Sequence, residues 1–324
     1  MRTSNDYLSA VIVLYVAGSS CLVTSANAQS QPGRQVRVAA IAIGFGGEYD
    51  KNLKLAMEHL EAAGKGGVDI ACLPEQFASD KAEPISGPTT KVVGQLAKKY
   101  GMYVVCPIRE LAADGCEYNT AVLLDRQGDI AGYYRKVFVF WGEGANLSRE
   151  GVKVFDTDFG RIAILICFDA NFDELWQEAE RKGAEIVFWP SAYDGGIPLN
   201  GYAMIHNYNV VGVGRGDMID VFGKAVTDVD KPHPGQTITT FDLDLTLIHM
   251  DFNRDKVKKL LREHAGEVEQ VSVLDPEGWF VLRAIKPGVQ VRELCEKYQI
   301  ETLRGYRHRS REQINQRRKA GQRV

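Results

Sequence analysis

Short apolar segments alternate along this chain with longer segments whose apolar residues recur at helical spacing. The apolar segment 35–45 precedes a helical pattern at 49–67, and the segment 160–169, "GRIAILICFD", precedes another at 172–184. A short strand that is apolar at consecutive positions is typically buried on both faces, so helices must cover its sheet. The alternation therefore predicts an α/β protein built in layers.

Length and composition limit the number of domains that the chain can form. With 324 residues, 45% of them apolar and 25% charged, the chain can bury one large core or two small ones. A polar, helix-prone stretch before residue 265 predicts that the compact domain covers 35–265 and that 266–324 form an appended C-terminal arm. The arginine-rich end, 303–324, is interpreted as a solvated terminal helix, with contact to an anionic surface as the alternative. A formal net charge of -3 gives no bulk attraction for nucleic acid.

The first residues resemble a secretory signal peptide. An apolar stretch, 8–18, precedes the small-x-small site "ANA", which ends at Ala28. We expect cleavage of residues 1–28 and export to the periplasm or outside the cell, without stable membrane insertion of the mature chain. The alternative is an uncleaved membrane anchor, because Arg2 is the one basic residue of the segment before the apolar stretch.

The cysteines and histidines argue against a metal centre. The mature chain has an odd number of cysteines, so at least one thiol is unpaired or pairs between molecules; they are Cys72, Cys106, Cys116, Cys167 and Cys295. No CxxC spacing occurs, and the six histidines are scattered singly. We expect no metal and no other cofactor.

Three reactive side chains follow predicted strands. Glu75 comes after "DIACLP", Lys136 after "GYYR" and Cys167 after "RIAILI". Taken singly, a cysteine after an apolar run is usually a packed core thiol, and a lone Glu or Lys is usually a solvated charge. Taken together they match one chemistry, because a thiol nucleophile needs a base and the attacked carbonyl needs a positive partner. The backbone N–H of Phe168 is a second candidate donor to the oxyanion.

The blocks "LPEQF", "YRKVF" and "ICFDANFDELW" resemble, in this order, the three signature blocks of the nitrilase, or carbon-nitrogen hydrolase, superfamily. The resemblance spans roughly residues 35–260. It implies a four-layer α-β-β-α sandwich that assembles into a homodimer or a higher homo-oligomer. It also makes residues 266–324 a candidate for packing on a partner subunit.

The resemblance also implies roles for individual residues. Cys167 is the expected nucleophile, Glu75 the general base and acid, and Lys136 the cation that stabilises the oxyanion. The family has a second active-site glutamate between the lysine and cysteine blocks. Glu143 and Glu150 are both candidates here, and Glu143 is favoured because it lies earlier in the loop.

The residues after the cysteine bear on the substrate. Nitrilases usually have Trp-Glu there, whereas this chain has Phe168 and Asp169, which favours an amidase or carbamoylase acting on a small amide-like molecule. Asn171 stands where many amidase-like members have an arginine, so an anchor for a substrate carboxylate is missing. Blocks that border the pocket in the family supply the candidate substrate-binding residues Asn119, Trp141, Tyr193 and Asp194. A nitrilase, an acyl transferase and a non-catalytic secreted binding protein on the same fold remain as alternatives.

Overall fold

The computed structural model describes residues 31–43 and 48–323. The expected signal peptide lies outside these residues. Within them, no helix is both long and apolar enough to cross a membrane.

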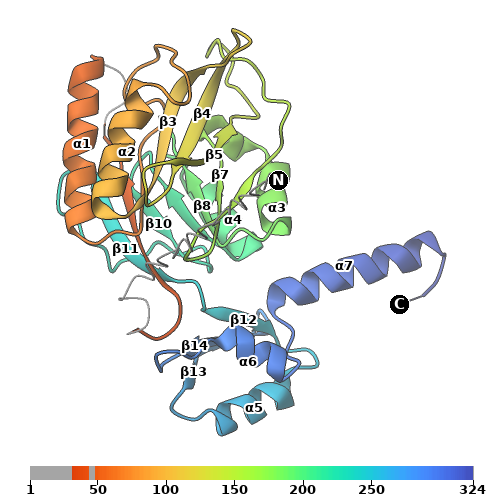
Figure 1. Cartoon of the computed structure of the whole chain (residues 1–324). Helices are drawn as coiled ribbons and strands as arrows, with labels where there is room; N and C mark the ends of the chain where they lie inside the picture. Colours follow the sequence, from red (N-terminus) through yellow and green to blue (C-terminus); the bar gives the residue numbers. More distant parts are fainter. Residues whose placement is uncertain (1–30, 44–47, 324) are drawn as a thin grey trace, which may run out of the picture.

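Two sheets form the body of the molecule (Figure 1). The first contains β1 (Gln35–Ile41), β2 (Ile70–Cys72), β3 (Tyr103–Leu111), β4 (Glu117–Leu124), β5 (Ile130–Arg135) and β11 (Gln236–Asp242). The second contains β6 (Val154–Asp156), β7 (Arg161–Ile164), β8 (Ile186–Trp189), β9 (Asn209–Gly212) and β10 (Asp217–Ile219). Their strand orders are β11-β1-β2-β3-β4-β5 and β10-β9-β8-β7-β6. In each sheet the central strands are parallel, as the strand-helix alternation predicts.

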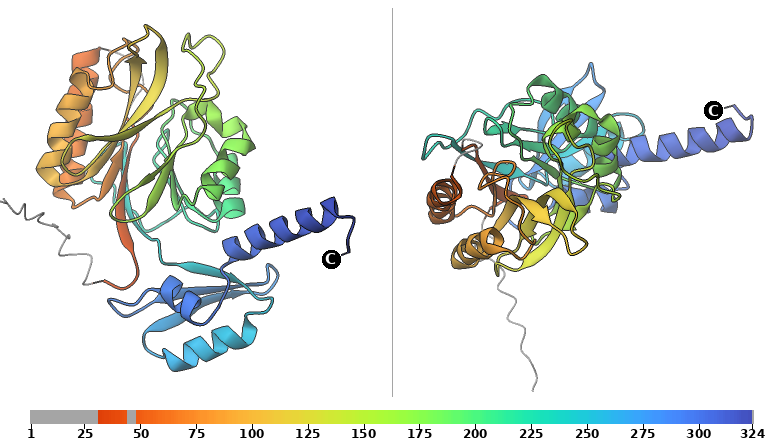
Figure 2. Two further views of the ribbon diagram at one scale, coloured as in Figure 1. Left: turned by 45° about the vertical axis from the view of Figure 1, so that its right-hand side comes forward. Right: turned by 90° about the horizontal axis from the view of Figure 1, so that it is seen from above.

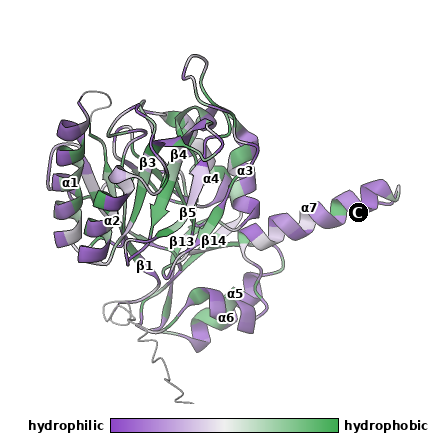
Figure 3. Ribbon diagram, turned by 45° about the horizontal axis from the view of Figure 1, so that its top comes forward, coloured by the Kyte–Doolittle hydropathy of each residue, from purple (hydrophilic) through white to green (hydrophobic). Residues whose placement is uncertain are grey.

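Helices cover the outer face of each sheet. Helices α1 (Tyr49–Lys65) and α2 (Pro88–Tyr100) lie on the first sheet, and α3 (Asp173–Arg181) and α4 (Ile197–His206) lie on the second (Figures 1 and 2). Figure 3 shows the same layering as apolar strands between helices whose outer faces are polar.

The burial pattern of β1 explains the layering. Val36, Val38 and Ala40 share a core with residues of the second sheet. Ala39 and Ile41 face the other way and pack with α1 and α2. Because alternate residues point to opposite faces, a strand buried at nearly every position needs a layer on each side. The expected α-β-β-α sandwich is confirmed.

A second, smaller unit follows the sandwich. It contains a sheet of order β12-β14-β13, formed by β12 (Thr246–His249), β13 (Val268–Leu274) and β14 (Trp279–Ala284). Helices α5 (Arg254–Glu263) and α6 (Val291–Lys297) pack on it around a core of its own. The expected boundary at residue 265 falls inside this unit, because β12 and α5 precede that residue and pack with β14 and β13.

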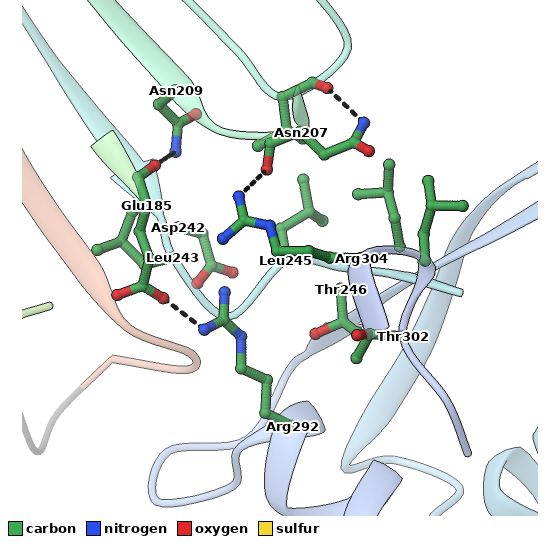
Figure 4. A pocket seen from close by; sticks show the side chains of 13 residues that line it. Glu185, Asn207, Asn209, Asp242, Leu243, Leu245, Thr246, Arg292, Thr302 and Arg304 are labelled. Carbon is green, nitrogen blue, oxygen red and sulfur yellow. Dashed lines mark hydrogen bonds and ion pairs between the residues drawn. The ribbon is translucent and has the colours of Figure 1, made fainter. Parts of the chain in front are cut away.

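The last helix, α7 (Leu303–Lys319), extends away from both units (Figure 2). Its first turn is bound to the sandwich, since the Arg304 guanidinium donates hydrogen bonds to the carbonyl oxygens of Ala184 at 3.0 Å and His206 at 3.1 Å. Near this contact a cavity lies between the sandwich and the C-terminal unit, and Glu185 accepts a hydrogen bond there from Arg292 of α6 (Figure 4). Glu185 also accepts a hydrogen bond from Arg34, which precedes β1. The bonds from Arg292 and Arg304 hold the C-terminal part of the chain against the sandwich. Packing of the unit on a partner subunit stays a prediction.

Candidate active site

The fold brings the three predicted catalytic residues to one place between the sheets. Glu75 follows β2 and Lys136 follows β5, both in the first sheet, whereas Cys167 follows β7 in the second. The side chains of Glu75 and Lys136 are buried, and Cys167 is partly buried. Because each residue stands within three residues of a strand end, the ladder that precedes it limits where its backbone can lie.

Lys136 lies between two glutamates. Its Nζ donates to Glu75 Oε1 at 2.9 Å and to Glu143 Oε2 at 2.7 Å. Asn119 joins the same two carboxylates, because its Nδ2 donates to Glu75 Oε1 at 2.7 Å and to Glu143 Oε1 at 2.6 Å. The backbone N–H of Lys136 also donates to the Asn119 carbonyl oxygen at 2.9 Å. One ammonium and one amide therefore fix both glutamates, which limits the rotamers open to each of them.

The second sheet completes the binding of Glu75. Its Oε2 accepts a hydrogen bond from the backbone N–H of Ala192 at 3.0 Å, in the segment after β8. The carboxylate is therefore held from both sheets. A general base that must face a thiol on one side and a leaving group on the other needs such an orientation.

Cys167 has an unusual backbone conformation. Its φ is +47°, in the left-handed region that costs a residue with a Cβ about 1 kcal/mol. Two hydrogen bonds hold it there, from Cys167 N to the Pro190 carbonyl at 3.0 Å and from Trp189 Nε1 to the Cys167 carbonyl at 2.9 Å. The residue begins a 3-10 helix, Cys167–Asn171. The N–H groups of a first turn have no acceptor inside their helix, so the Phe168 N–H is available to an oxyanion.

The charges around Cys167 favour the neutral thiol. Burial and the negative charge of Glu75 raise the pKa of the Cys167 thiol to about 12, although Lys136 opposes the shift. Burial would lower the pKa of Lys136, but Glu75, Cys167 and Glu143 outweigh it and raise that pKa instead. At neutral pH the site therefore holds a protonated thiol beside a charged ammonium. Glu75 is the carboxylate whose charge acts on the thiol, so it is the group placed to take the thiol proton.

This protonation state predicts a pH profile for alkylation. The rate of Cys167 modification by iodoacetamide is expected to rise about tenfold per pH unit from pH 6 to 9, because the thiolate fraction does so below the pKa. Peptide mass spectrometry measures it, with Cys167→Ala as the blank. A rate that levels off between pH 6 and 8 would show that a thiolate forms already in the resting site.

The structure separates the two candidates for the second glutamate. Glu143 contacts Lys136 and Asn119, and it also accepts a hydrogen bond from the backbone N–H of Phe140 at 3.2 Å. Glu150 lies in a partly exposed ion pair with Lys153. Glu143 is therefore the glutamate that shares the lysine with Glu75.

The predicted substrate-binding residues lie in different surroundings. Asn119 is 1% exposed and sits within the charged cluster, so its side chain acts on the two glutamates. Trp141 is 87% exposed and Tyr193 is 41% exposed, and contact of either side chain with a substrate stays a prediction. The exposed Asp194 faces Arg215 at 3.9 Å. Burial raises the pKa of the Tyr193 hydroxyl, and the Tyr193 ring lies edge-on to the ring of Trp189 with centroids 5.1 Å apart.

Two residues around the nucleophile were missed in the sequence. Ser191 lies beside Cys167 and lowers the pKa of its thiol, and the buried Asp169 binds the backbone on both sides of the site. Asp169 was considered for substrate class alone, since "CFD" in a sequence does not say where the carboxylate points.

All five cysteines of the described residues are free. Cys72 and Cys106, on neighbouring strands, belong to different cores and so face opposite sides of the sheet.

Comparisons with known proteins agree with this geometry. The carbon-nitrogen hydrolase family profile matches residues 36–208, which is 173 of the 324 residues. The chain is 37% identical over 160 residues to Beta-ureidopropionase of Arabidopsis thaliana, covering 42% of this chain and 38% of that protein. It is 29% identical over 182 residues to N-carbamoylputrescine amidase of Solanum lycopersicum, covering 50% and 60%. The chain therefore matches about 38% to 60% of the length of these curated relatives.

Solved structures share the fold over a longer stretch. Nit3 of Saccharomyces cerevisiae, a member of the nitrilase superfamily, has a TM-score of 0.58 at 22% identity, covering 65% of this chain and 91% of that one. The amidase from Nesterenkonia sp. AN1, in complex with butyramide, has a TM-score of 0.57 at 17% identity, covering 72% and 97%. Because the family profile also spans more than half of its residues, this chain belongs to the carbon-nitrogen hydrolase family.

Proposed function

We propose that the protein hydrolyses a non-peptide carbon-nitrogen bond of an amide or N-carbamoyl compound through a cysteine thioester. The observation that carries this proposal is the cluster of Glu75, Lys136 and Glu143 beside the Cys167 thiol. It contains the base, the cation and the nucleophile that acyl transfer to a thiol requires.

The first half of the reaction forms the thioester. Because the thiol is protonated at rest, Glu75 accepts its proton as sulfur bonds to the substrate carbonyl carbon. The charge that develops on the carbonyl oxygen is stabilised by Lys136 and by the Phe168 N–H. When the carbon-nitrogen bond breaks, Glu75 returns the proton to the leaving nitrogen, which departs as ammonia or an amine.

The second half releases the product. Glu75, again a carboxylate, takes a proton from water as the water oxygen attacks the thioester carbon. The carbon-sulfur bond then breaks, and the sulfur recovers its proton from Glu75. Glu143 has a different part, because its contact with Lys136 holds the ammonium charged and in place throughout.

The relatives support a small amide or N-carbamoyl substrate. Their printed names include a ureidopropionase, an omega-amidase and an N-carbamoylputrescine amidase. Asn171 donates a hydrogen bond to the Phe168 carbonyl at 3.1 Å and supplies no positive charge. Arg215, whose guanidinium lies 3.9 Å from the Asp194 carboxylate, is the cation that we propose for contact with a substrate carboxylate.

Ammonia release tests the proposal. The purified protein is incubated with a simple aliphatic amide, an N-carbamoyl amino acid, an N-carbamoyl amine and a nitrile, beside Cys167→Ala. We expect release from an amide or N-carbamoyl compound and none from the variant. Release from the nitrile alone would favour a nitrilase. Silence with every compound, while Cys167 still reacts with iodoacetamide, would favour an acyl transferase, and silence with an inert Cys167 would favour a non-catalytic binding protein.

We also propose that the mature protein is exported after cleavage of residues 1–28. The motivation is the apolar stretch followed by "ANA". The mass of the native protein tests this, since Gln29 should be its first residue and an intact Met1 would contradict export by cleavage.

Assembly into a homo-oligomer is proposed as well. Helix α4 leaves three large apolar side chains exposed, with Ile197 at 85%, Met204 at 47% and Ile205 at 53%. Exposed apolar groups on one helix are typical of a surface that another subunit covers. Light scattering on the purified protein distinguishes a dimer or larger assembly from a monomer, and a monomer at micromolar concentration would contradict the proposal.

A further inference from the structure

A buried carboxylate joins the two catalytic blocks. Asp169 is fully buried, and its Oδ1 accepts a hydrogen bond from the backbone N–H of Phe138 at 2.8 Å. Its Oδ2 accepts two more, from the backbone N–H of Ile166 at 2.9 Å and from the Tyr134 hydroxyl at 2.8 Å. The two carboxylate oxygens of Asp169 therefore accept three hydrogen bonds in total.

These donors belong to the two segments that carry the reaction. Tyr134 and Phe138 stand two residues to either side of Lys136, on the first sheet and the loop after it. Ile166 directly precedes Cys167 at the end of the second sheet. The carboxylate thus joins the backbone of the lysine segment to the turn that holds the nucleophile, across the gap between the sheets.

Aromatic packing supports the same connection. The rings of Phe138, after Lys136, and Phe172, after the 3-10 helix, are stacked with centroids 3.5 Å apart. Trp176 Nε1 donates to the Asp169 carbonyl at 3.3 Å. The turn after Cys167 is therefore packed against the lysine loop on one side and α3 on the other.

The arrangement has an energetic cost. Burial raises the pKa of Asp169 to about 6, although the hydrogen bonds from Ile166, Phe138 and Tyr134 and the charge of Lys136 oppose the shift. At neutral pH the carboxylate is ionised, and no cation within residues 31–43 and 48–323 forms an ion pair with it. A buried charge that stability alone would not favour points to a functional demand on the geometry that it fixes.

We propose that Asp169 is a positioning residue that sets the Cys167 turn and the Phe168 N–H against Lys136, so that the oxyanion forms between its two donors. The expected effect of Asp169 on kcat rests on the proposed function. Asp169 itself touches neither substrate nor the reacting atoms. It acts through the backbone of Ile166 and Phe138.

The test uses Asp169→Asn. An amide has one acceptor oxygen, so it cannot accept from Phe138 and from Ile166 at once, and the amide nitrogen must face one of the two N–H groups. We expect kcat to fall about a hundredfold with KM changed by less than about threefold, as when an oxyanion donor is misplaced. Tyr134→Phe, which removes one donor and keeps the carboxylate, is expected to lower kcat by about tenfold.

A second readout does not require a substrate. Cys167 and Cys116 are alkylated with iodoacetamide in the same sample, and their rates are compared by peptide mass spectrometry. Cys116 lies by the β3–β4 turn, outside the site, so it serves as the internal reference. We expect the ratio of the Cys167 rate to the Cys116 rate to change at least about tenfold in Asp169→Asn.

Glu180→Gln is the matched control. Glu180 is another buried carboxylate, bound to His308 at 2.8 Å between α3 and α7. Its loss should destabilise the fold without changing kcat or the alkylation ratio.

The proposal is overturned if folded Asp169→Asn keeps the wild-type ratio, or if Glu180→Gln changes that ratio equally. Should Asp169→Asn fail to fold, an unchanged ratio in Tyr134→Phe overturns it. If no compound is hydrolysed by the wild type, the proposed function fails, and the ratio still decides the role of Asp169.

Discussion

Replacement of Cys167 by alanine is expected to lower kcat for amide hydrolysis by at least roughly 10⁴-fold, because alanine has no sulfur to form the thioester. Glu75 and Lys136 keep their contacts with each other in the variant, so the site stays assembled. Ammonia release under saturating substrate measures the loss. Turnover above about 1% of the wild-type rate would exclude Cys167 as the nucleophile.

A second substitution at the same position separates chemistry from stability. Because φ of Cys167 is +47°, glycine fits this backbone better than alanine does. Cys167→Gly should therefore exceed Cys167→Ala in free energy of unfolding by about 1 kcal/mol, while both variants are inactive. Urea denaturation measures the difference. Equal stabilities would show that the turn relaxes when the sulfur is lost.

Much of the sandwich could be predicted from the sequence because its strands are apolar on both faces. The pattern at 160–169 identifies a strand that ends at a reactive cysteine, and the structure contains β7 there. The C-terminal unit was harder to predict. Strand β13 is exposed or half-buried at all but its first residue, so its sequence lacks the continuous apolar run that marks a central strand.

Some residues of the candidate site could likewise be predicted from the sequence, and others could not. Glu75, Lys136 and Cys167 each stand at a strand end, and each is visible in a local block of sequence. The contacts of Asn119 and Asp169 are not local. Asn119 reaches Glu75, 44 residues away, and Asp169 reaches Tyr134, 35 residues away, so their roles depend on which strands the two sheets bring together.

Lys136→Met is expected to have the second large effect, on stability as well as on activity. Lys136 is 1% exposed and lies between two carboxylates, so methionine would keep the volume and remove the charge that compensates them. Loss of one partner of a buried ion pair typically costs about 3–5 kcal/mol of unfolding free energy. Loss of the cation that we propose for the oxyanion should lower kcat by about 10³-fold.

Two further variants test whether the lost stability of Lys136→Met comes from the two carboxylates that it leaves unpaired. Lys153→Met removes a lysine of a partly exposed pair with Glu150, and it should change the unfolding free energy by less than about 1 kcal/mol. The double variant Lys136→Met/Glu143→Gln removes one of the two stranded charges, so part of the lost stability should return while activity does not. Urea denaturation and ammonia release are measured on all three proteins. If Lys136→Met alone destabilised the fold no more than Lys153→Met, Glu75 and Glu143 would not need the ammonium between them, and Lys136 would serve the reaction without holding the site together.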